Sequence, residues 1–198
     1  MQISIVYHSG FGHTERLARA VEAGATEAGA KVSLLVASEL SQRDKGPWET
    51  LENADAIIFG SPTYMGAVSA PFAEFAAASA AVYKRHGWKD KLAAGFTNSG
   101  KPAGDKFATL SQMFVLASQH GMLWVPPALH PGFSKAGDSY DVGINRTGHY
   151  TGVATHSYSD HSPDESPSGN ELETGRLLGA RVATLAARWT QSASNPAE

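Results

Sequence analysis

The sequence predicts an α/β fold in which a parallel sheet is covered by helices on both faces. Short apolar segments alternate along the chain with longer segments in which apolar residues recur every three or four positions. The short segments lack a strict alternation of apolar and polar residues, which is typical of strands buried on both faces. A chain of 198 residues with 42% hydrophobic residues suits one core. We therefore expect one domain over residues 1–190 and a flexible tail over 191–198.

The order of elements is expected to be strand then helix throughout. The expected strands are short, bounded by Gly or Pro, and cover residues 3–7, 32–36, 56–59, 92–96 and 123–125. A helix follows the first strand, because Leu17, Val21 and Ala25 share one face and Gly29 ends the pattern. Further helices are expected at residues 71–81, 105–120 and 171–189. This order predicts parallel strands joined by right-handed crossovers.

Two polar segments interrupt the alternation. Residues 38–50 indicate a surface connection, with one helical turn at residues 48–53. Residues 129–170 are rich in Gly, Ser, His, Asp and Pro, and are far longer than most connections. Loops of this length usually carry function or help assembly.

The composition excludes several classes of function. The chain has no Cys, which rules out disulfides, thiolate catalysis and Cys-ligated metals. A formal net charge of −3 without any basic run argues against a nucleic-acid partner. No apolar run approaches the roughly 20 residues of a spanning helix, and the first strand leaves no room for a signal peptide, so we expect a cytoplasmic protein without stable membrane insertion. The spacing of His149, His156, Asp160 and His161 fits no standard zinc site, so no metal is expected.

A Gly-rich turn lies between the first strand and the first helix and is the strongest functional signal. It consists of Ser9, Gly10, Phe11, Gly12, His13 and Thr14. Such a turn directs several backbone N–H groups at the positive end of the helix dipole, and Ser9 and Thr14 add hydroxyl donors. The turn therefore predicts a phosphate site.

Two more loops of small residues follow the third and fourth strands. One contains Pro62, Thr63, Tyr64, Met65 and Gly66; the other contains Thr97, Asn98, Ser99, Gly100, Lys101, Pro102 and Ala103. Ligands of open parallel sheets bind beyond the carboxyl ends of the strands, where these loops should meet the first turn. Together they predict a site for a phosphate attached to a flat heteroaromatic ring.

Three nucleotide-related motifs are incomplete. Residues 95–102 have the spacing of a phosphate-binding P-loop, but Pro102 stands where a Ser or Thr should bind Mg²⁺. The first turn begins like a dinucleotide fingerprint, yet Glu15 replaces the small residue that helix–strand packing needs. A phospho-receiver domain needs a carboxylate after the third strand, where Gly60, Ser61 and Pro62 stand instead.

Ordered sequence blocks along nearly the whole chain carry a family resemblance. They cover residues 7–14, 18–21, 24–25, 54–63, 91–93 and 120–122. The chain resembles the flavodoxin-like NAD(P)H:quinone oxidoreductases of the WrbA type. This resemblance implies a flavodoxin-like, doubly wound five-stranded parallel sheet of order 2-1-3-4-5, an insertion around the last strand, and FMN as the cofactor.

The resemblance also implies roles for individual residues. The turn from Ser9 to Thr14 would hold the FMN phosphate, Thr63 to Met65 would follow the ring and ribityl chain, and Asn98 to Ala103 would face the other edge of the ring. The substrate space would be bordered by Phe11, Tyr83, Gln119 and His120. Gln119 replaces a His of the family pattern and cannot take up a proton. Tyr83 and His120 also suit structural positions at helix ends, and that alternative stays open.

The function implied is two-electron transfer from NADH or NADPH through FMN to a quinone-like acceptor, with the two substrates taking turns. A homodimer or homotetramer is implied, with residues 129–160 as candidate contacts. Lys101 and Arg146 are the candidates for contacting a 2′-phosphate of NADPH. A one-electron flavodoxin carrier and an FMN-binding regulatory protein are the alternatives; the small net charge favours the enzyme, since flavodoxins are typically strongly acidic.

Overall fold

The computed structural model describes residues 1–140 and 142–193. Its strands are β1 Gln2–Tyr7, β2 Lys31–Val36, β3 Ala56–Tyr64, β4 Ala67–Val68, β5 Leu92–Ser99, β6 Leu123–Trp124 and β7 Val153–His156. Its helices are α1 His13–Glu27, the short 3₁₀ helix η1 Ala37–Leu40, α2 Trp48–Glu52, α3 Ala70–Ala78, α4 Ala80–Tyr83, α5 Lys106–Gln119 and α6 Gly169–Ala193.

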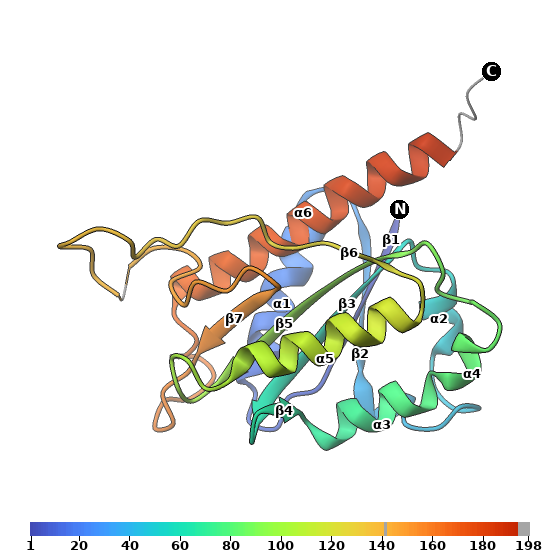
Figure 1. The fold of residues 1–198 in the computed structure, drawn as a ribbon, viewed down its shortest axis with the longest axis horizontal. Helices are drawn as coiled ribbons and strands as arrows, with labels where there is room; N and C mark the ends of the chain where they lie inside the picture. The colour runs from blue at the N-terminus through green and yellow to red at the C-terminus, as the bar shows by residue number, and fades with distance from the viewer. Residues whose placement is uncertain (141, 194–198) are drawn as a thin grey trace.

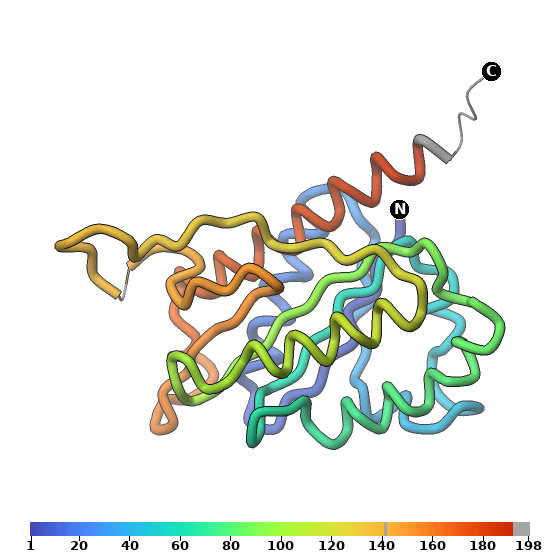
Figure 2. Tube along the Cα trace, viewed as in Figure 1, coloured from blue at the N-terminus to red at the C-terminus, as the bar shows by residue number. Residues whose placement is uncertain are grey.

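The sheet has the order β2-β1-β3-β5-β6, and β7 also pairs with β5. Leu92 of β5 pairs with Leu123 of β6, and Phe96 pairs with Val153 of β7, all in parallel. β6 and β7 are therefore two halves of one split edge strand, and the doubly wound 2-1-3-4-5 order is confirmed. The chain between them, drawn in gold, projects from the body of the molecule (Figure 2). Residues 129–170 thus contain a strand that the sequence did not predict.

Helices cover both faces of the sheet, as expected (Figure 1). On one face α1 and α6 pack together over the sheet through Leu17, Val21, Leu178 and Val182. Their backbones approach closely, because a Cβ at Gly179 would lie 1.9 Å from the carbonyl oxygen of Val21.

The opposite face of the sheet carries a second core beneath α3 and α5. Its residues include Phe59, Phe72, Phe75, Trp88, Leu110 and Met113. Apolar residues therefore lie on both sides of the central strands, which explains why those strands read as continuous apolar runs in the sequence.

Strands β3 and β5 extend beyond their predicted ends, and this shapes the edge of the sheet. β3 continues through Pro62 to Tyr64, pairing Pro62 with Asn98 of the lengthened β5. The expected loop at Pro62–Gly66 is wrong for Pro62 to Tyr64, which continue β3, and the expected loop at Thr97–Ala103 is wrong for Thr97 to Ser99, which continue β5. A proline fits here because β1 ends opposite Gly60, so that β3 has no parallel neighbour on that side at Pro62.

The helices differ from expectation at three places. The helix expected at residues 71–81 divides into α3 and α4 at Ser79, whose hydroxyl donates to the carbonyl oxygen of Ala76 at 2.7 Å. A 3₁₀ turn forms within the first connection. α6 continues through Ala193, so the expected tail begins in a helix and ends, at residues 194–198, outside the described residues. No helix in the described ranges combines the length and apolarity that crossing a bilayer requires.

Candidate cofactor-binding site

The turn between β1 and α1 has the geometry of an anion cradle. Gly12 precedes α1 with a φ of 87°, a conformation that favours glycine, and its carbonyl accepts the N–H of Arg16 at 2.9 Å. The N–H groups of the first helical turn lack intrahelical partners, as at every helix N-terminus. The Ser9 hydroxyl oxygen is buried and has no hydrogen-bond partner within the described part of the chain. Both features suit a phosphate group.

Tyr64 forms a second wall beside this turn. β3 ends at Tyr64 and turns at Met65 and Gly66, which have φ values of 49° and 74°, into β4. The Tyr64 hydroxyl lies against Gly10. A Cβ atom added to Gly10 would be 2.5 Å from the hydroxyl oxygen of Tyr64. Burial raises the pKa of Tyr64. Tyr64 therefore stays a neutral phenol beside the turn.

The third wall is the end of β5, fixed by hydrogen bonds to the end of β7. The Asn98 amide oxygen accepts the hydroxyls of Thr155 at 2.8 Å and Ser157 at 3.1 Å. The N–H of Ser157 donates to the carbonyl of Ser99 at 3.1 Å. These bonds hold the adjacent strand ends rigidly at the edge of the sheet.

A fourth wall, residues 157–163, was missing from the predicted site. Pro163 lies against the first turn, since a Cβ at Gly12 would be 2.5 Å from its Cγ. Arg16 anchors this segment by donating to the carbonyl of Pro163 at 2.6 Å. The Tyr158 ring lies between His156 and His161, at centroid distances of 4.7 and 5.0 Å. The sequence signal was the short Val153–His156 strand pattern, whose carboxyl end reaches the same edge.

The four walls enclose a pocket of about 470 Å³. It is lined by Ser9, Gly10, Phe11, His13, Thr14, Pro62, Tyr64, Asn98, Ser99, Gly100, Ser157, Tyr158, Ser159, His161 and Pro163. A volume of this size lies within the range of small-ligand and cofactor sites. The helix N-terminus, the unpartnered Ser9 hydroxyl and the aromatic rings of Phe11, Tyr64 and Tyr158 fit a ligand with both a phosphate and a flat ring, as FMN has.

Eight residues predicted to bind the cofactor lie beside the pocket or beneath it. They are Gly12, Thr63, Met65, Gly66, Thr97, Lys101, Pro102 and Ala103. The hydroxyls of Thr63 and Thr97 are buried and bonded to each other at 2.8 Å, which joins β3 to β5 under the site. Met65 points fully into solvent. Their predicted contacts with FMN stay predictions.

Tyr83, Gln119 and His120 lie away from this pocket. His120 follows the C-terminal end of α5, whereas the pocket adjoins the start of that helix, about 20 Å away for a helix of this length. His120 is buried, accepts from or donates to the Ser79 hydroxyl at 2.9 Å and packs 4.3 Å from the Trp88 ring. Burial lowers its pKa to about 4. Within one chain these residues do not border the pocket, and their substrate role stays a prediction.

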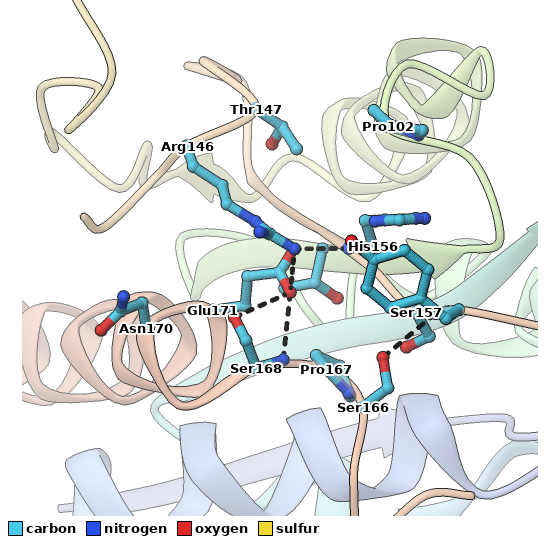
Figure 3. Close-up of polar contacts among 12 residues, drawn as sticks. Pro102, Arg146, Thr147, His156, Ser157, Ser166, Pro167, Ser168, Asn170 and Glu171 are labelled. Carbon is cyan, nitrogen blue, oxygen red and sulfur yellow. Dashed lines mark hydrogen bonds and ion pairs between the residues drawn. The ribbon is translucent and has the colours of Figure 1, made fainter. Parts of the chain in front are cut away.

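A buried polar cluster lies behind the third and fourth walls (Figure 3). Arg146 and Glu171 form an ion pair at 2.9 Å, with side chains only 3% and 2% exposed. Glu171 also accepts the N–H of His156 at 2.6 Å and the N–H of Ser168 at 3.1 Å. The second of these bonds belongs to a capping box at the start of α6. The ion pair therefore connects the projecting segment, β7 and α6.

Comparisons with known proteins identify the family of the chain. A family model described as NADPH-dependent FMN reductase matches residues 7–134. The chain is 40% identical over 181 residues to flavodoxin FldP of Pseudomonas aeruginosa (strain UCBPP-PA14), covering 91% of this chain and 94% of that protein. It is 31% identical over 206 residues to an NAD(P)H dehydrogenase (quinone) of Archaeoglobus fulgidus, covering 93% and 97%.

A solved structure is similarly close. It is the flavodoxin, WrbA-like protein from Agrobacterium tumefaciens, with a TM-score of 0.70, 37% sequence identity, and coverage of 94% of this chain and 98% of that one. The resemblance to the WrbA type that the sequence indicated is confirmed. Family model, relatives and fold agree, and the chain belongs to the NADPH-dependent FMN reductase family.

Proposed function

We propose that this chain is an FMN-dependent oxidoreductase that transfers two electrons from NADH or NADPH to a quinone, with the two substrates binding in turn. The observation that carries the proposal is the pocket at the carboxyl edge of the sheet, where a helix N-terminus and an unpartnered hydroxyl meet three aromatic rings. The balanced reaction consumes NAD(P)H, a proton and the quinone, and yields NAD(P)⁺ and the hydroquinone. Bound FMN supplies the hydride and electron chemistry.

The side chains of the pocket bind and orient. Ser9, Thr14 and the first amides of α1 hold the phosphate. Phe11 is 75% exposed and Tyr64 and Tyr158 are partly exposed, so their rings are available to pack against the flat ring and exclude water from it.

His13 is a fixed positioning residue. Its Nδ1 lies 2.7 Å from the carbonyl oxygen of Ser166, and a carbonyl accepts only, so Nδ1 carries the proton. That bond ties the first turn of α1 to Ser166, three residues after the fourth wall ends. The ring is therefore held in one orientation, which preserves the shape of the cradle.

Steady-state oxidation of NADH and NADPH with a benzoquinone, by protein loaded with FMN, tests the proposal. We expect turnover that depends on both FMN and the quinone, with parallel lines in double-reciprocal plots, as substrates that bind in turn produce. Turnover without added quinone, at the same rate, or no turnover at all, would contradict it.

A second candidate is a one-electron carrier, which the 40% identity to a protein named flavodoxin favours. The two functions differ in how reduction proceeds. Stepwise reduction under anaerobic conditions should show little flavin radical if the chain is the proposed enzyme. A radical that dominates at the midpoint, together with absent quinone turnover, would favour the carrier.

A further inference from the structure

Lys106 is a buried cation in an unfavourable position. It is the first residue of α5, and its side chain is completely shielded from solvent. Burial of an ammonium costs free energy, and the start of a helix is the positive end of its dipole. Lys106 therefore contributes nothing to the stability of α5 by its charge, and its position needs another explanation.

The hydrogen bonds of Lys106 go to the loop between β5 and α5. Its ammonium donates to the carbonyl oxygen of Lys101 and, at 2.9 Å, to that of Pro102. Its backbone N–H donates to the carbonyl of Ala103 at 3.2 Å. The carbonyls of three successive residues thus point at the start of α5.

This arrangement determines where the amide side of the loop faces. In a planar trans peptide the N–H points opposite to the carbonyl. Because the carbonyls of Pro102 and Ala103 point at Lys106, the N–H groups of Ala103 and Gly104 point away from it. Pro102 has no N–H, so no amide hydrogen of this residue points toward Lys106. The preceding residues Ser99 and Gly100 line the pocket directly.

The surroundings of Lys106 leave its side chain mostly protonated at neutral pH. Burial lowers its pKa to about 8; the neighbouring Glu171 favours the charged form and Arg146 opposes it. Burial, and to a smaller extent the charge of Lys106, lower the pKa of His149 and His156. Both rings are therefore neutral near pH 7. At pH 7 Lys106 is therefore mostly protonated, as a cation behind the pocket wall.

We propose that Lys106 is a positioning residue behind the FMN pocket: its ammonium holds the carbonyls of Lys101 and Pro102, which fixes the loop that continues from the lining residues Ser99 and Gly100, and its charge favours the negatively charged reduced ring over the oxidised one. The inference rests on the proposed function, since it assumes FMN in the pocket.

The first test compares Lys106→Met with Lys84→Met, which removes an exposed lysine directly after α4. We expect the Kd for oxidised FMN to rise about tenfold in Lys106→Met and the Kd for reduced FMN about a hundredfold, because bonds to a charged donor are lost. The tenfold difference lowers the two-electron midpoint potential by about 30 mV. Lys84→Met should match the wild type in all three values.

Hydrogen exchange of the apo-protein separates this inference from the proposed function. The amides of residues 99–101, 103 and 104 should exchange about tenfold faster in Lys106→Met than in Lys84→Met, whether or not FMN binds. If wild-type protein fails to bind FMN, the proposed function falls, while the exchange result still decides the role of Lys106. A well-folded Lys106→Met with unchanged exchange and an unchanged Kd ratio would overturn the inference.

A pH titration of the wild type decides the case even if Lys106→Met does not fold. FMN affinity should fall about tenfold between pH 6.5 and pH 9 as Lys106 loses its proton. His149 and His156 stay neutral over that range, and the Arg146–Glu171 pair stays in place. Affinity that is flat from pH 6.5 to pH 9 would also overturn the inference.

Discussion

Ser9 carries the most direct residue-level prediction. Its buried hydroxyl has no partner in the described ranges of the chain, so the apo-protein gains nothing from it. Ser9→Ala should leave the free energy of unfolding unchanged or raise it slightly, while FMN affinity falls about tenfold, since bonds to charged groups contribute about 1.5–3 kcal/mol. Urea unfolding of the apo-protein and calorimetric FMN titration measure the two effects. A Ser9→Ala variant that loses stability but binds FMN normally would assign Ser9 a structural role.

Gly12 provides a second prediction, with Gly29 as its matched control. Both have nearly the same φ, 87° and 88°, but a Cβ at Gly12 strikes Pro163 whereas a Cβ at Gly29 meets nothing within 4 Å. Gly29→Ala should cost about 1–2 kcal/mol of stability from backbone strain and leave FMN affinity unchanged. Gly12→Ala should cost more stability and weaken FMN binding at least tenfold, measured by the same two methods. Equal FMN affinities would remove Gly12 from the site.

His120 makes stability depend on pH. Its pKa is about 4 in the folded protein against about 6.5 when unfolded, so the unfolded chain binds the proton more readily. The folded state therefore loses stability as the pH falls from 6.5 toward 4, by up to about 1.4 kcal/mol per pH unit. Urea unfolding at pH 7 and pH 5 should show a smaller loss in His120→Gln than in the wild type. Identical losses would mean that His120 is protonated in the folded state.

At the scale of elements, α6 depends on the buried ion pair at its start. Glu171→Gln leaves the Arg146 charge without its carboxylate and should cost about 3–5 kcal/mol, as broken buried pairs do. Glu173→Gln, two residues later, removes a partly exposed partner of Arg176 and should cost at most about 1 kcal/mol. Urea unfolding compares the two variants. Similar small costs would show that water already reaches Arg146.

The elements were largely predictable from the sequence because their signals are local. Leu17 and Val21 mark the buried face of α1, and the apolar runs of β1 and β5 mark central strands. The extension of β3 to Tyr64 was not predictable in this way, since Pro62 is tolerated only because β1 ends beside it. The division of the edge strand was not predicted either: residues 123–125 were expected as a strand, but the short run Val153–His156 was left inside the long connection, and its pairing with β5 shows only in the structure.

The residues of the predicted site also differ in whether their sequence signal is local or depends on contacts with distant segments. Ser9 and Gly10 line the pocket, and the sequence could point to them because the turn chemistry typical of a phosphate site is carried by consecutive residues. Tyr158 and Pro163 were missed because a long connection separates them from the residues they contact. Lys106 was missed because its sequence position suggests an exposed helix start, and only the structure shows its burial.

At the scale of the whole molecule, the projecting segment predicts assembly. Phe133 is 45% exposed and packs against Tyr140 at a centroid distance of 5.8 Å. Both belong to the connection between β6 and β7, part of which projects from the body of the molecule (Figure 2). We expect a homodimer or homotetramer in which residues 129–160 contact a second copy. Phe133→Ser should shift sedimentation toward the monomer, with Phe107→Ser, also exposed but on α5, as control. A wild type that sediments as a monomer would contradict the prediction.

The most direct test of the account is calorimetric titration of the apo-protein with FMN, compared with riboflavin, which lacks the phosphate. The account predicts one FMN per chain, and binding of riboflavin that is at least a hundredfold weaker, because we propose that the turn from Ser9 to Thr14 holds the phosphate. Absence of FMN binding, or equal affinity for riboflavin, would contradict the central claim that this edge of the sheet is an FMN site.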